Sequence, residues 1–165
     1  MATEIWTAKS VSSALPETRA RLSADLARLG QLSGEAQGLN GPITSLEKLL
    51  SAENQTVLVR YSPDGTAVAF LKFGRKSLYL YDPHGRMANL EVDCLLDFFC
   101  VEEERRQGIG LQLFRSMLSI TGLEPCRLAY DRPSPLLISF MKKHFQYSTP
   151  DIQPNRFAIF QGFWG

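Results

Sequence analysis

Two glycines beside two arginines form the first group of residues that could carry chemistry. They lie in the stretch Asp93–Met117, which reads DCLLDFFCVEEERRQGIGLQLFRSM. The apolar pattern predicts a strand over residues 95–101, a charged turn over 102–107 and then an amphipathic helix opened by Gly108 and Gly110. The first backbone N–H groups of a helix are unpaired and bind anions, and glycine lets phosphate oxygens approach the main chain. The stretch therefore predicts a phosphate-binding turn.

Two interpretations of this turn are open. In a dinucleotide site, Gly108 and Gly110 would begin G-x-G-x-x-G and Asp131, roughly 20 residues on, would bind a ribose. Leu113 stands at the third glycine position, however, and the polar turn separates strand from glycines where a tight turn is needed. No G-K-[ST] follows, which excludes a nucleotide P-loop. The other interpretation is the motif R-x-x-G-x-G, with Arg105 as its arginine, after an antiparallel strand.

An aspartate and a cysteine are the other candidates for chemistry. Asp131 follows a predicted strand over residues 126–130, where its carboxylate could accept a proton or hold an ammonium group. It could equally cap the helix predicted over residues 135–144. Cys94 lies in a predicted strand, where most cysteines are small core residues, although a partly solvated thiol could act as a base or in a proton path. Asp97, in the same apolar strand, could line a substrate entry, face solvent or pair with an arginine.

Composition limits the kinds of protein this could be. A chain of 165 residues with 44% apolar residues can bury one core, so we expect a single domain over 1–165 with an N-terminal helical portion over 1–34. The net charge of +1 and the lack of a long apolar run or basic leader predict no nucleic-acid partner and no membrane. We also expect a monomer.

The cysteines indicate the compartment. There are three, at positions 94, 100 and 126, all in apolar strand-like segments, and no two have the spacing of a metal pair. We therefore expect a reducing compartment and no metal site. Cys100 and Cys126 are assigned to the core.

The remaining elements follow from periodicity and turn residues. A helix is predicted over 16–32 and ended by Ser33–Glu35, a loop over 37–42 and a short helix over 44–52. The predicted strands are 55–62, 67–73, 77–82, 126–130 and 155–164, with turns at 63–65, 74–76 and 83–85. This order predicts an α+β fold with a mixed, mainly antiparallel sheet flanked by helices.

Several blocks of sequence together carry a narrower resemblance. Besides CLLDFFCVEEERRQGIGLQLFRSML, they are AQGLNGPITS, LAYDRPSPLLISFMKKHF and PNRFAIFQGFW. In this order the chain resembles the α-tubulin N-acetyltransferases, a family of the GNAT superfamily of acyl-CoA-dependent N-acetyltransferases. The resemblance covers roughly residues 35–164. The part before residue 35 does not align, and the long polar C-terminal tail of many members is not present, so we expect a catalytic core or a short member.

The resemblance implies a GNAT-like fold and an activity. Acetyl-CoA would donate its acetyl group directly, in a ternary complex, to a lysine side chain of α-tubulin in microtubules. The location implied is the cytoplasm and its microtubules, including the axoneme of a cilium or flagellum. The alternatives are an inactive acyl-CoA-binding or tubulin-binding module, and an acetyltransferase for another amine.

Site residues carry over where the motifs match. The resemblance implies catalytic roles for Gln37, Cys94 and Asp131, with an acetyl adduct on Cys94 as the alternative to direct transfer. Asp97 and Phe163 are the candidates for the substrate groove. The acetyl-CoA site would comprise Phe98, Phe99, Cys100, Val101, Arg105, Arg106, Gln107, Gly108, Ile109, Gly110, Leu111, Ser134, Pro135, Leu137, Phe140 and Lys143.

Overall fold

The computed structural model describes residues 2–165, apart from the side chains of Ala2 and Arg106. Its residues fall into two compact units. Unit 1 comprises Met1–Phe73 and Asp97–Met117, and unit 2 comprises Gly74–Leu96 and Leu118–Gly165. The single domain predicted over 1–165 stays a prediction.

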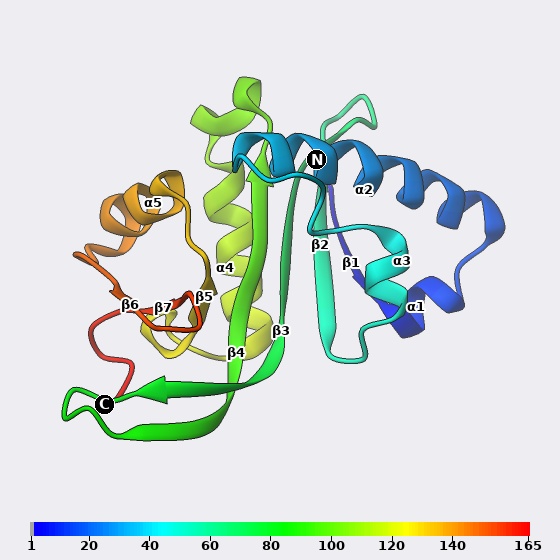
Figure 1. The fold of residues 1–165 in the computed structure, drawn as a ribbon. Coiled ribbons are helices and arrows are strands. Elements are labelled where there is room, and N and C mark those ends of the chain that lie inside the picture. The colour runs from blue at the N-terminus through cyan, green and yellow to red at the C-terminus, as the bar shows by residue number, and fades with distance from the viewer. Residues whose placement is uncertain (1) are drawn as a thin grey trace. The chain divides into compact units, whose positions relative to one another are not determined.

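The described strands form one mixed sheet (Figure 1). They are β1 (Ala2–Thr7), β2 (Gln55–Tyr61), β3 (Ala67–Tyr81), β4 (Met87–Cys100), β5 (Ala129–Asp131), β6 (Asp151–Ile152) and β7 (Phe157–Ile159). Their order in the sheet is β1-β2-β3-β4-β5-β7-β6. β4 and β5 are parallel, whereas β1 with β2, β5 with β7 and β6 with β7 are antiparallel. The predicted α+β class with a mixed sheet is confirmed.

Three helices of unit 1 gather beside β1 and β2 (Figure 1). They are α1 (Ala8–Ser12), α2 (Pro16–Ala36) and α3 (Leu46–Leu50). Leucines at helical spacing on α2, Leu22, Leu26 and Leu29, are fully buried and pack in one core with residues of β2 and β3. Burial of this stripe, rather than local propensity, stabilises the helix.

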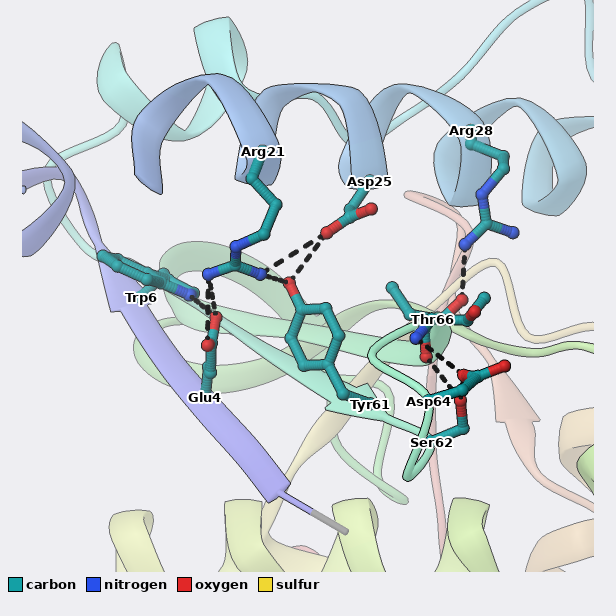
Figure 2. A network of polar contacts seen from close by, with 10 residues as sticks. Glu4, Trp6, Arg21, Asp25, Arg28, Tyr61, Ser62, Asp64 and Thr66 are labelled. Carbon is teal, nitrogen blue, oxygen red and sulfur yellow. Dashed lines mark hydrogen bonds and ion pairs between the residues drawn. The ribbon is translucent and has the colours of Figure 1, made fainter. Parts of the chain in front are cut away.

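The N-terminal portion is not wholly helical as predicted, because it begins with β1, an edge strand paired with β2. Figure 2 shows how β1 is tied to α2. Arg21 of α2 pairs with Glu4 of β1 at 3.1 Å and also donates to the Tyr61 hydroxyl, which donates to Asp25 at 2.9 Å. The helix pattern alone could not predict β1, since these partners lie 17 to 40 residues apart.

Helix α2 runs to Ala36 and passes through Ser33–Glu35, where the sequence predicted its end. Gly30 and Gly34 explain the continuation. A Cβ at Gly30 would lie 2.4 Å from the Thr44 carbonyl oxygen, and one at Gly34 would lie 2.8 Å from that of Gly41. The glycines thus serve close approach of the following loop rather than helix termination. The loop over 37–42 and a helix after it, shortened to α3, are confirmed.

The turn predicted at 74–76 is also wrong, because β3 is continuous from Ala67 to Tyr81. Arg75 instead forms a 3.4 Å ion pair with Asp93 of β4, and Ser77 donates to Asn89 at 2.8 Å. These polar side chains project from a strand whose backbone stays in the sheet. The turn at 83–85 is confirmed: Asp82 and Arg86 flank it with a 2.9 Å backbone hydrogen bond.

Unit 2 has shorter terminal strands than predicted. Residues 125–127 form a 3₁₀ turn, η2 (Pro125–Arg127), so β5 begins only at Ala129. Proline favours such a turn, and the Tyr130 hydroxyl donates to the Pro125 carbonyl at 2.7 Å. The closing strand ends at Ile159, and the chain then turns through Gly162, whose φ is 97°. Helix α5 (Pro135–Phe145) lies beside these strands (Figure 1).

Candidate active site

The glycine turn predicted to bind phosphate is present in unit 1. After β4, residues 102–107 form a 3₁₀ helix, η1 (Glu102–Gln107), and α4 (Ile109–Thr121) follows. Gly108 joins them with φ of 76°, a left-handed conformation that glycine adopts without strain. Apart from its chain neighbours, no described atom lies within 4 Å of a Cβ at Gly108. A side chain at this position would therefore meet open space, although the positive φ would strain it.

Packing on both sides holds this turn in place. The predicted apolar positions of α4, Ile109, Leu113, Phe114 and Met117, are all buried. The Phe114 ring lies 6.3 Å from that of Phe98, centroid to centroid. The turn is therefore anchored by one face of β4 and the buried face of α4.

Arg105 and the end of β4, which both belong to the predicted acetyl-CoA segment, lie together in unit 1. Arg105 Nε donates to the Cys100 carbonyl at 3.0 Å, and its guanidinium carbon lies 5.8 Å from the Phe99 ring centroid. Val101 N donates to the Val68 carbonyl at 2.9 Å. Cys100 is half-buried rather than a core residue, and burial raises the pKa of its thiol to about 11.

Further residues of the predicted segment lie at the turn and helix start. Gln107 ends η1 and is exposed, whereas Gly110 and Leu111 lie half-buried in the first turn of α4. The side chain of Arg106 lies outside the described part of the chain. The strand end, turn and helix start expected to bind acetyl-CoA are thus contiguous in this unit.

The second predicted acetyl-CoA segment forms the start of α5 in unit 2. Ser134 caps this helix by accepting a hydrogen bond from Leu137 N at 3.2 Å, and Pro135 occupies the first turn. The rings of Phe140 and His144 are tilted against each other with centroids 4.6 Å apart, and Lys143 is exposed in the last turn. The cap is therefore Ser134, and the alternative that Asp131 caps this helix is wrong.

Asp131 and Cys94 lie on neighbouring parallel strands of unit 2. Cys94 is in register with Ala129, two residues before Asp131, the last residue of β5. Because alternate strand residues share a face, Asp131 and Cys94 lie on the same face of this pair. The Asp131 side chain is 15% exposed, and its Oδ1 accepts from Arg132 Nε at 3.2 Å.

Cys94 does not have the solvated thiol that a base requires. Its side chain is fully buried and its Sγ donates to the Val92 carbonyl at 3.3 Å. Burial is the main cause that raises the pKa of Cys94 to about 12, and the Asp131 charge adds to it, whereas Lys76 opposes it. The thiol is consequently neutral at physiological pH.

Gln37 and Asp97 meet in unit 1. Gln37 Nε2 donates to Ser33 Oγ at 2.9 Å and to Asp97 Oδ1 at 3.2 Å. Ser33 Oγ also donates to Asp97 Oδ1 at 3.0 Å, and Thr44 Oγ1 donates to Oδ2 at 2.7 Å. Asp97 is only 5% exposed. Its side chain is therefore buried, and no arginine among the described residues pairs with it. A role in lining the substrate entry stays a prediction.

Comparison with known proteins identifies the family. A model of a GNAT acetyltransferase family, Mec-17, matches residues 3–165. The chain belongs to the Mec-17 family of GNAT acetyltransferases. The family resemblance read from the sequence is thereby confirmed.

Individual relatives agree with this assignment. An α-tubulin N-acetyltransferase of Anopheles gambiae is 39% identical over 150 residues, covering 90% of this chain and 31% of the relative. One of Plasmodium knowlesi is 39% identical over 148 residues, covering 88% of this chain and 77% of the relative. This chain thus spans less than a third of the mosquito protein's length.

Among solved structures, the acetyltransferase domain of xEco2, bound to a CoA conjugate, superimposes with a TM-score of 0.61. The sequence identity is 11%, and the alignment covers 87% of each chain. At this identity the likeness concerns the fold alone, and it confirms the GNAT-like architecture.

Phe163 of this Mec-17 family chain packs inward. It is half-buried against the core cluster of unit 2 that contains Cys94, Leu96 and Ala129. Its carbonyl accepts from Arg127 Nη1 at 3.1 Å. The core interpretation of this aromatic residue therefore holds, and a role in a substrate groove stays a prediction.

Sequence reasoning missed the polar partners of Gln37 and Asp97 in the Mec-17 chain. Ser33 and Thr44 lie 64 and 53 residues from Asp97 in sequence, so no local pattern connects them. The small residues Gly30, Ser33 and Gly34 on the buried face of α2 were the available signal, because they indicate a close approach to that face.

The described residues contain neither a metal-binding cluster nor a membrane-spanning helix. No group of three or more His, Cys, Asp or Glu side chains there could hold a metal ion. In the same part of the chain, no helix combines the length and apolar character of a membrane span.

Proposed function

We propose that this protein transfers an acetyl group from acetyl-CoA to a lysine side chain of α-tubulin in microtubules. The observation that carries the proposal is the match to α-tubulin N-acetyltransferases over 90% of the chain. It is supported by the turn at Gly108, by the carboxylate of Asp131 at a strand end, and by the presence of Gln37. Transfer is direct, within a ternary complex of enzyme, acetyl-CoA and substrate.

The residues of unit 1 fit the phosphates of acetyl-CoA. The start of α4 supplies unpaired N–H groups next to Gly108, whose Cβ position is open, and the exposed side chain of Arg105 adds positive charge to this turn. The helix dipole strengthens the attraction for an anion. In unit 2, Ser134, Pro135, Leu137, Phe140 and Lys143 form the second proposed binding segment.

Acetyl-CoA, when bound, supplies a thioester whose carbonyl carbon bonds to the lysine nitrogen as the C–S bond breaks, giving acetyl-lysine and the CoA thiol. The lysine ammonium, with a pKa of about 10.4, must first lose a proton, which costs roughly 4 to 5 kcal/mol at pH 7. Asp131 is the proposed base or ammonium anchor, because its carboxylate is partly exposed at the carboxyl end of β5. Of the two protons released, one ends on the CoA sulfur and the other reaches solvent.

In this proposal Cys94 does not act as a base. Its neutral, buried thiol lies on the same face of the strand pair as Asp131. A thiolate is the nucleophilic form of cysteine, so a neutral thiol argues against an acetyl adduct on Cys94. This supports direct transfer.

The partners and location follow from the proposed substrate. The protein would act as a monomer on microtubules of the cytoplasm, including those of a ciliary or flagellar axoneme, without a nucleic-acid or membrane partner. With a net charge of +1, no strong overall field attracts it to the acidic tubulin surface, so binding depends on local contacts.

Acetylation of assembled microtubules by the purified protein tests the proposal. Microtubules, free tubulin and an unrelated lysine-rich protein are each incubated with acetyl-CoA, and acetyl-lysine is located by mass spectrometry. We expect modification of α-tubulin, fastest on polymer, and none without acetyl-CoA. Acetyl-CoA binding without transfer would indicate an inactive binding module, and equal modification of the unrelated protein would indicate another amine substrate.

A further inference from the structure

The backbone of Gln37 is fixed by the end of helix α2. Gly38 follows with φ of 71°, and its N–H donates to the Glu35 carbonyl at 3.1 Å. Leu39 N donates to the Gly34 carbonyl at 2.9 Å. These two bonds and the left-handed glycine form a Schellman motif in which Gln37 is the C-cap residue. The residue therefore has a defined main-chain position.

The hydrogen-bond partners of Gln37 determine which way its side-chain amide is turned. Gln37 turns its NH₂ group toward Asp97, because Asp97 Oδ1 accepts a hydrogen bond from Gln37 Nε2. Ser33 gives its own hydroxyl proton to Asp97 and thus accepts the second N–H of Gln37. The amide oxygen Oε1 is then directed away from Asp97, as an acceptor for a donor outside this cluster.

Asp97 is itself held from several directions. Its Oδ1 accepts from Phe98 N at 3.0 Å in addition to Ser33 and Gln37, and its Oδ2 accepts from Thr44. Lys72, which is also 5% exposed, donates to the carbonyl of Ile43, the residue before Thr44, at 3.1 Å. The two buried charges thus hold the same loop against the sheet of unit 1.

We propose that Asp97 is a positioning residue for acetyl transfer, acting only through Gln37. It orients the amide so that Oε1 is presented to a substrate donor, and it does not itself touch the substrate. The inference rests on the proposed function, because it assumes that Gln37 takes part in the reaction.

A double-mutant cycle tests this dependence. Asp97→Asn keeps the shape of the side chain but removes its charge, whereas Gln37→Ala removes the group that Asp97 orients. We expect Asp97→Asn to lower kcat about tenfold with KM for acetyl-CoA unchanged. In the Gln37→Ala background the same substitution should cause no further loss, because the two residues act as one unit.

Tyr61→Phe is the matched control. Tyr61 is a buried residue of unit 1 whose hydroxyl donates to Asp25 (Figure 2). Removing this hydroxyl therefore also removes a polar contact of the same unit. We expect a loss of melting temperature comparable with that of Asp97→Asn and no change in kcat. Equal falls in kcat for the two variants, or additive losses in the cycle, would overturn the proposal.

Two further measurements cover the remaining outcomes. If Asp97→Asn does not fold, Ser33→Ala, which removes the other acceptor of Gln37, replaces it in the cycle with the same expectation.

NMR of the Gln37 side-chain amide, assigned by its absence in Gln37→Ala, reports the orientation of the amide independently of any activity measurement. A shifted, slowly exchanging amide that is lost in Asp97→Asn supports the geometry, and an unchanged signal contradicts it. If the wild-type protein shows this amide signal but does not acetylate tubulin, the proposed function is rejected, and with it the role of Asp97 in acetyl transfer.

Discussion

Cys94 and Asp131 share one face of the parallel strand pair β4 and β5, with Cys94 in register with Ala129. The carboxylate is partly exposed, whereas the thiol is fully buried. The Asp131 charge further raises the pKa of Cys94, after the larger effect of burial. The pair therefore combines a partly exposed carboxylate with a buried, neutral thiol.

Replacing Asp131 by asparagine should abolish most of the activity without unfolding the protein. Asp131→Asn keeps the shape but loses the negative charge, so kcat for tubulin acetylation should fall roughly 10²-fold or more. The melting temperature should change little, because the ion pair lost is with the exposed Arg132. Initial rates and thermal unfolding measure the two effects.

Asp93→Asn is the control for that experiment. Asp93 is another aspartate of unit 2 that pairs with an arginine, Arg75. We expect its rate to stay near that of the unchanged protein. A fall as large as that of Asp131→Asn would show that general charge loss, rather than a base at position 131, controls the rate.

Replacing Cys94 by alanine should leave the pH dependence of the reaction unchanged between pH 6 and 9. With a pKa of about 12, the thiol does not titrate in this range, so it cannot supply a limb of the pH–rate profile. The substitution removes a buried sulfur and should cost about 1 to 2 kcal/mol of unfolding free energy. Profiles of kcat/KM for both proteins provide the measurement. Loss of a limb in Cys94→Ala would establish the thiol as a titrating group, and an acetyl adduct on it would replace direct transfer.

Acetyl-CoA should raise the melting temperature, whereas NAD and ATP should not. A ligand that binds only the folded protein stabilises it by mass action. Gly110→Trp, which fills the space at the start of α4, should abolish this shift. Ser119→Trp, at an exposed position in the C-terminal half of the same helix, should retain it. A normal acetyl-CoA response of Gly110→Trp would place the phosphates elsewhere, and stabilisation by NAD alone would favour a dinucleotide site.

Stability should fall steeply in alkaline solution. The pKa of Cys94 rises from 9.0 to about 12 on folding, so the unfolded chain loses this proton first as pH increases. The stability due to the neutral thiol is complete below pH 9 and is lost between about pH 9 and 12, by up to about 4 kcal/mol. Cys94→Ala should flatten the pH dependence of denaturant unfolding in this window. Tyr147→Phe should flatten it only above pH 10, because the pKa of Tyr147 rises from 10.0 to about 12, mainly through burial.

Local patterns were enough to predict the glycine turn that opens α4. The strand before it, the glycine at Gly108 and the apolar face of α4 depend on residues within a few positions of one another, so periodicity and glycine chemistry could predict them. The turn at 83–85 is local in the same sense.

Tertiary structure alone decided the environment of each candidate catalytic group. Asp97 meets Ser33 and Thr44 because the glycines of α2 admit a loop that is distant in sequence from β4. Cys94 is neutral because the packing of unit 2 removes it from water. Residue type and spacing thus determined which groups are present, whereas burial and non-local hydrogen bonds, which depend on the assembled sheet, determined their charge and orientation.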